Sequence, residues 1–122
     1  MKLKQQLQKL ERIAGSLGFE VIYSNETNCS ETDKVISVNA NYTLRNKIYA
    51  LAHEIGHAET LPDCQAAFGR LTPSGCDRSW STREAEFCAW LAADLFANDL
   101  NFYDKYYLQF KHAHLASYYQ KD

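Results

Sequence analysis

The chain is short and nearly neutral, and it carries no long run of like charge. It has 122 residues, of which 13 are basic and 15 acidic, with a net charge of −2 and a pI near 6.1. This length suits one domain over residues 1–122 and leaves no room for a separate substrate-recognition module. The balanced charge lacks the basic surface of a nucleic-acid-binding protein, so we expect no direct nucleic-acid partner.

The first predicted element is an amphipathic helix over residues 1–17. Its apolar side chains recur at helical spacing: Leu3, Leu7, Leu10, Ile13 and Leu17. The segment lacks the apolar core of a signal peptide, and no later stretch is apolar for long enough to span a bilayer. We therefore expect a cytoplasmic protein without a membrane partner.

The cysteines agree with that compartment. The chain has four, Cys29, Cys64, Cys76 and Cys88, and no two of them form a C-x-x-C pair. Cysteines of cytoplasmic proteins are mostly reduced, so we expect free thiols. Cys64 and Cys76 bracket one loop, which leaves a disulfide or a second metal site there as an alternative.

Two short strands are predicted after the first helix. Phe19–Tyr23 and Lys34–Val38 are rich in β-branched and aromatic residues, and the polar run Ser24–Asp33 separates them. The strand Lys34–Val38 is a candidate edge strand that can pair with an extended peptide, and the alternative is a strand paired within the sheet. A turn then leads to a helix for which Thr43 is a suitable N-cap.

Helices dominate the rest of the chain. The helix from Thr43 should end near Pro62. The segment from Pro62 to Trp80 is rich in turn residues and should be irregular, with at most one helical turn at Gln65–Phe68. Two further helices are predicted, one over Arg83–Asn98 with Ser81 or Thr82 as its cap, and one over Phe102–Tyr119. The predicted fold class is α+β, with an N-terminal helix, a short sheet of two or three strands, and three helices.

The helix from Thr43 contains the pattern H-E-x-x-H, as His53-Glu54-Ile55-Gly56-His57. Residues four apart share a face of a helix, so both imidazoles can bind one Zn²⁺ while Glu54 faces a water on the metal. The alternative is a chance pattern on a solvated helix face. The neighbours argue against chance, because buried histidines and a buried acid need a partner. These neighbours are all apolar: Ala50, Leu51, Ala52, Ile55 and Ala58.

Catalytic zinc usually has three protein ligands and one open position, so a third ligand is needed. The candidates are Glu59, Asp63, Cys64, Cys76, Asp77, Glu84, Glu86, His112 and His114. In the next predicted helix, Glu84 lies on the same face as an apolar stripe that follows it at helical spacing. An apolar stripe packs on the core, so Glu84 should point into the core. That stripe consists of Phe87, Cys88, Leu91 and Leu95. Glu86 lies about 200° around the helix from Glu84 and should face solvent or a flank. Helix capping is the alternative role for Glu84.

Asp63 is the main rival as third ligand. It stands six residues after His57, where metzincins have their third ligand. The turn glycine that those enzymes require is Thr60 here. Their methionine turn is also missing, because Met1 is the single methionine of the chain.

Three local patterns give the chain a resemblance to the ImmA/IrrE family of metallopeptidases. Val35–Val38, followed by Arg45 and Ile48–Ala52, resembles the family's strand and its approach to the sequence LAHELGH. The motif itself has Gly56 before its second histidine, as the family prefers. Glu84–Leu91 resembles the family's segment EANxFAxxL, whose glutamate is a zinc ligand.

The resemblance covers about residues 34–95 and departs from the family in three places. Glu86 stands at the family's asparagine, Cys88 stands at its phenylalanine, and Asp94-Leu95-Phe96 replaces the usual proline. These departures concern substrate and partner more than the metal. The resemblance implies a small zincin-like metallopeptidase domain with Glu84 as the third zinc ligand. It also implies a protein or peptide substrate, with a helix-turn-helix transcriptional repressor as a candidate.

The expected chemistry is peptide hydrolysis with Zn²⁺ on His53, His57 and Glu84. Zinc lowers the pKa of a bound water toward about 7, and Glu54 is the general base that later returns the proton to the leaving amine. His114 in the last helix is the candidate donor to the oxyanion. The aromatic stripe beside it, which includes Tyr103, Tyr107 and Phe110, suits a core role.

Two other functions fit parts of the pattern. The first is a non-catalytic zinc-binding interaction module, of the kind that a phage or mobile element can encode. Glu54 disfavours it, because a structural zinc site needs ligands but no base. The second is zinc-dependent hydrolysis of a substrate other than a peptide, and the sequence contains no nucleotide or sugar motif that favours it.

Overall fold

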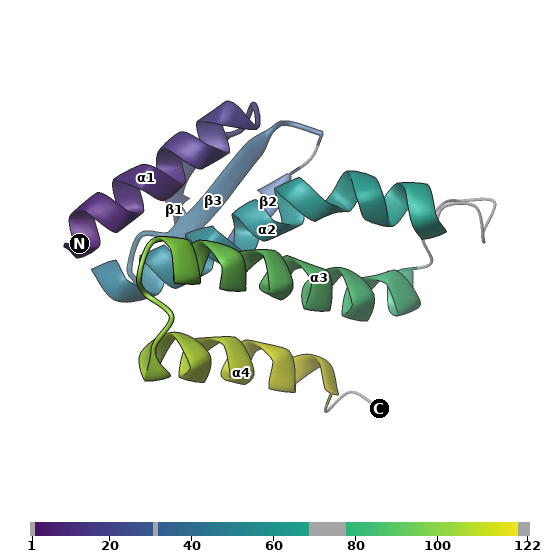
Figure 1. Cartoon of the computed structure of the whole chain (residues 1–122). Coiled ribbons are helices and arrows are strands. Elements are labelled where there is room, and N and C mark those ends of the chain that lie inside the picture. The colour runs from purple at the N-terminus through teal and green to yellow at the C-terminus, as the bar shows by residue number, and fades with distance from the viewer. Residues whose placement is uncertain (1, 31, 69–77, 120–122) are drawn as a thin grey trace.

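The computed structural model of the chain describes residues 2–30, 32–68 and 78–119, and within these the side chains of 61–68, 78–84 and 118–119 are outside the description. Its elements, shown in Figure 1, confirm the α+β class. They are α1 (Leu3–Ser16), β1 (Glu20–Ser24), β2 (Asn28–Ser30), β3 (Val35–Asn39), α2 (Leu44–Phe68), α3 (Arg78–Asp99) and α4 (Lys105–Tyr119).

The three strands form a small mixed sheet in the order β1-β3-β2. β1 pairs with β3 in parallel and β2 pairs with β3 antiparallel, with Cys29 opposite Ile36. The prediction of Lys34–Val38 as an edge strand was therefore wrong, and the alternative of a strand paired within the sheet is confirmed, because β3 has a neighbour on each side. β2 lies inside the polar run Ser24–Asp33, where the sequence predicted no strand, because three residues are too few to show a strand pattern.

α2 is the central element of the fold and contacts α1, α3, α4, β2 and β3. The structure confirms Thr43 as its N-cap, because the Thr43 hydroxyl accepts a hydrogen bond from the backbone N–H of Asn46 at 3.2 Å. The apolar residues around the H-E-x-x-H motif are all buried, as predicted. They join α1 and the sheet in one core whose fully buried members include Leu10, Ile36, Val38, Ile48, Leu51 and Ile55.

Two helix boundaries differ from the predictions. α2 continues past Pro62 to Phe68, and α3 begins at Arg78, before the predicted caps Ser81 and Thr82. A proline inside a helix costs about 3 kcal/mol, but the contacts of a long helix can outweigh that cost. None of the helices in the described ranges combines the length and the hydropathy needed to cross a membrane.

α2 and α3 run side by side (Figure 1). They pack closely at Gly56. A Cβ atom at Gly56 would overlap with the backbone carbonyl of Ala89. Only small side chains fit such an approach, and the buried face of α3 is accordingly rich in alanine: Ala89, Ala93 and Ala97. The predicted apolar stripe was wrong, because its large members face outward: Phe87 is 47% exposed, Leu91 50% and Leu95 66%.

This close approach gives a prediction on stability. Gly56→Ala should destabilise the fold by about 3 kcal/mol, because the new methyl group meets backbone atoms that cannot rotate away. Gly15→Ala is the matched control, since a Cβ there meets no atom within 4 Å. Alanine in a helix should leave stability unchanged or raise it by about 0.5–1 kcal/mol. Urea unfolding of both variants measures the difference, and equal stabilities would contradict the packing described here.

Candidate metal centre

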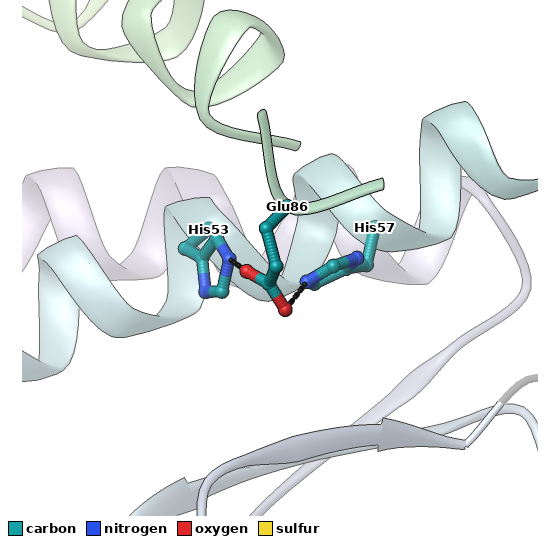
Figure 2. Close-up of side chains that lie close together, drawn as sticks. All are labelled: His53, His57 and Glu86. Atoms are coloured by element: carbon teal, nitrogen blue, oxygen red, sulfur yellow. Dashed lines mark hydrogen bonds and ion pairs between the residues drawn. The ribbon is translucent and has the colours of Figure 1, made fainter. Parts of the chain in front are cut away.

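The two histidines of the motif lie one turn apart on the buried side of α2. His53 is 3% exposed, and the His57 side chain is 20% exposed. Their Nε2 atoms both point toward one carboxylate that comes from α3 (Figure 2). The i, i+4 spacing in the sequence thus produces the shared face that was predicted.

That carboxylate belongs to Glu86. Its Oε2 is 2.7 Å from Nε2 of His53, and its Oε1 is 3.0 Å from Nε2 of His57. Glu86 is 8% exposed and contacts both histidines, so the prediction that it faces solvent or a flank was wrong. Glu84 lies in α3, but its side chain is outside the described residues, so the predicted Glu84 ligand has no described position.

The alanine-rich face of α3 explains the position of Glu86. Ala89, Trp90, Ala93 and Ala97 follow Glu86 at spacings of three, four, seven and eleven residues, and all four are buried. The pattern of small residues opposite Gly56 could have revealed this face in the sequence. The larger residues Phe87, Leu91 and Leu95 instead led to the prediction that the opposite face of α3 is buried, because hydrophobic patterning gives most weight to bulky side chains.

The donor atoms of His53, His57 and Glu86 all lie within 4.8 Å of one another. Two imidazole nitrogens and one carboxylate oxygen match a three-ligand site that leaves a further position open. The residues therefore fit a divalent transition metal. The same lone pairs that would bind a metal share protons in the hydrogen bonds described above, so metal binding must displace those protons.

The pKa shifts in the metal-free cluster follow from these contacts. Burial alone lowers the pKa of His53, but hydrogen bonds to Glu54 and Glu86 outweigh burial and raise it to about 9. Burial alone raises the pKa of Glu86, but hydrogen bonds from His114, His53 and His57 hold it well below its ordinary value. Glu86 is therefore an ionised carboxylate between imidazoles, the protonation state that a metal ligand requires.

His114 reaches the same carboxylate from α4. Its Nε2 is 3.0 Å from Oε2 of Glu86, the oxygen that His53 also contacts. Trp90 lines this part of the site, because its ring stacks on His53 with the centroids 4.4 Å apart and lies 5.6 Å from the ring of His114. The predicted candidate His114 thus contacts the centre, and its contact there is with the carboxylate of Glu86.

Glu54 lies between the two histidines in sequence and faces the same cleft. It is 6% exposed, and its Oε1 is 3.3 Å from Nδ1 of His53. A cleft of about 410 Å³ contains Glu54, His53, His57, Glu86 and His114 in its walls. The opposite wall comes from Thr27 and the β2 residues Asn28 and Cys29.

The other predicted ligands are not in this cluster or are not described. Glu59 and His112 are exposed. The side chains of Asp63 and Cys64, and the whole of Cys76 and Asp77, lie outside the described residues. The alternative disulfide or second metal site of Cys64 and Cys76 therefore stays a prediction, while Cys88 is a free thiol.

Comparison of the chain with protein-family models, with curated proteins and with solved structures found no match. The centre has a group that could hold a metal ion, formed by His53, His57 and Glu86, and Glu54 lies beside this group in one cleft.

Proposed function

We propose that the protein is a zinc-dependent metallopeptidase of the ImmA/IrrE type that cleaves a peptide bond in a protein substrate. One observation carries the proposal, namely the convergence of His53, His57 and Glu86 beside the carboxylate of Glu54 in an open cleft. Zinc there would polarise a substrate carbonyl and lower the pKa of water. His53 and His57 from α2 and Glu86 from α3 would hold the ion.

Glu54 has the place of the general base. Its carboxylate lies on the wall of the cleft, within the same helical turn as the two histidines. From there it takes the proton of the attacking water and then delivers that proton to the leaving amine. Its contact with Nδ1 of His53 keeps the carboxylate directed toward the ligand cluster.

β2 is the surface that fits an extended peptide. It lies at one edge of the sheet, with β3 as its neighbour in the described sheet, and it lines the cleft through Asn28 and Cys29. A peptide that adds to this edge gains main-chain hydrogen bonds and runs along the cleft past the histidines. We therefore assign to β2 the pairing with an extended peptide that was first predicted for Lys34–Val38. A helix-turn-helix repressor as the physiological substrate stays a prediction of the resemblance.

Two alternatives use the same residues. Two histidines and one carboxylate also bind Fe(II) in oxygenases, and a zinc-binding interaction module needs the ligands alone. Glu54 favours hydrolysis over both, because a hydrolase needs a base beside the metal ligands, whereas a structural zinc site needs the ligands alone. Metal analysis of the purified protein separates iron from zinc. An assay for peptide cleavage distinguishes a metallopeptidase from a zinc-binding interaction module.

The proposal is tested by incubating the zinc-loaded protein with a library of unstructured peptides and with helix-turn-helix repressors. Mass spectrometry should detect new peptide termini, which should be absent after chelation and return with added zinc. A protein that binds one zinc ion but produces no cleavage of any peptide would favour the interaction module.

His114 gives a further prediction. Its hydrogen bond orients the Glu86 carboxylate, so His114→Ala should weaken zinc binding by roughly tenfold. If His114 also donates to the oxyanion, kcat at saturating zinc should fall by about 10². His112→Ala is the matched control, because His112 is exposed on the same helix. A zinc titration and a rate measurement assess the two roles separately, and wild-type values for both in His114→Ala would exclude His114 from the site.

A further inference from the structure

We propose that Asp94 of α3 is a positioning residue that fixes α4 so that His114 meets Glu86. The purpose of this arrangement rests on the proposed metal centre. The contact between His114 and Glu86 joins two side chains directly, so the arrangement can be tested without zinc.

Asp94 binds α4 through both of its carboxylate oxygens. The Tyr107 hydroxyl donates to Oδ1 at 2.6 Å, and the Lys111 ammonium donates to Oδ2 at 2.8 Å. Tyr107 is fully buried, and the side chains of Lys111 and Asp94 are 15% and 21% exposed. Two donors from successive turns of one helix restrict both its rotation and its sliding along α3.

The face of α4 that Asp94 holds is also the face that carries His114. Tyr107, Lys111 and His114 are spaced by four and then three residues, so they lie along one side of the helix. A shift of α4 by one residue would turn this side by about 100° and move it by about 1.5 Å. The 3.0 Å hydrogen bond from His114 to Glu86 would not survive such a shift.

The start of α4 is fixed separately. Asp104 accepts a hydrogen bond from the backbone N–H of Tyr107 at 3.0 Å, and its Oδ1 is 3.4 Å from the Tyr49 hydroxyl of α2. Further along α4, the side-chain hydrogen bonds that join it to α3, within the described ranges, are those of Asp94 and that of His114. Asp94 therefore sets the register of the half of α4 that presents His114.

The first test measures the imidazole ¹⁵N resonances of His114 by NMR in the metal-free protein. Asp94→Asn and Lys111→Met should each move these resonances toward those of the exposed His112. Asp99→Asn, the same change at an exposed position of α3, should leave them in place. Lys111→Met keeps the Tyr107 hydrogen bond, so it reports on the register even if Asp94→Asn is poorly folded. Unchanged His114 resonances in both variants would overturn the proposal.

The second test is a double-mutant cycle on zinc affinity. Asp94→Asn should raise the zinc dissociation constant by roughly tenfold, whereas the same change in a His114→Ala background should alter it by less than about twofold. An equal loss in both backgrounds would mean that Asp94 acts on general stability. If the wild-type protein binds no zinc, the proposed function fails, and the NMR result still decides the role of Asp94.

Discussion

Replacing Glu54 with glutamine should lower the rate of peptide cleavage by roughly 10²–10⁴-fold and leave the metal bound. Glutamine has nearly the same shape and can still accept a hydrogen bond from Nδ1 of His53, which is 3.3 Å from the Glu54 carboxylate. It cannot accept a proton from water at neutral pH. The change therefore removes the base and preserves the ligand cluster. Cleavage rates at saturating zinc, together with the metal content of the purified variant, measure the two effects.

Glu59→Gln is the matched control for this substitution. Glu59 lies on the same helix and is exposed, so the same chemical change there should leave both rate and metal content at wild-type values. Cleavage by Glu54→Gln at the wild-type rate would exclude Glu54 as the base. Loss of the metal from Glu54→Gln would instead show that Glu54 supports the ligands.

Replacing Glu86 with alanine should abolish metal binding, with a loss of affinity greater than roughly 100-fold. Glu86 supplies the carboxylate of the cluster, and its contacts with His53 and His57 are 2.7 and 3.0 Å. Removal of an outer-shell partner already costs 10–100-fold, so loss of a ligand should cost more. Zinc at 100 times its dissociation constant stabilises a protein by about 2.7 kcal/mol, a gain that Glu86→Ala should lose.

Glu84→Ala and Asp63→Ala are the comparisons that decide the ligand set. Both residues were candidates for the third ligand, and both should retain zinc affinity within a few-fold of wild type if Glu86 is the ligand. Calorimetric zinc titration of the three variants gives the answer directly. Loss of zinc from Glu84→Ala with retention in Glu86→Ala would assign the ligand to Glu84, and the cluster would have to rearrange when the metal binds.

The local elements of this protein were predictable because their causes are local. The period of apolar residues predicted α1, β-branched residues predicted β3, and the Thr43 side chain predicted the start of α2. The strand β2 and the extension of α2 past Pro62 were missed. A three-residue strand exists because a neighbouring strand pairs with it, and a proline stays in a helix when tertiary contacts outweigh its cost.

The sequence by itself determined half of the candidate centre. His53, Glu54 and His57 belong to one helix, so their spacing fixed their mutual positions. The third carboxylate comes from another helix, and the choice between Glu84 and Glu86 depended on which face of α3 meets α2. That face was decided by the close approach at Gly56, where alanines fit and bulky side chains do not. The contact of His114 with Glu86 likewise depends on how α4 packs on α3, because interactions between residues distant in sequence arise from packing and not from helical spacing.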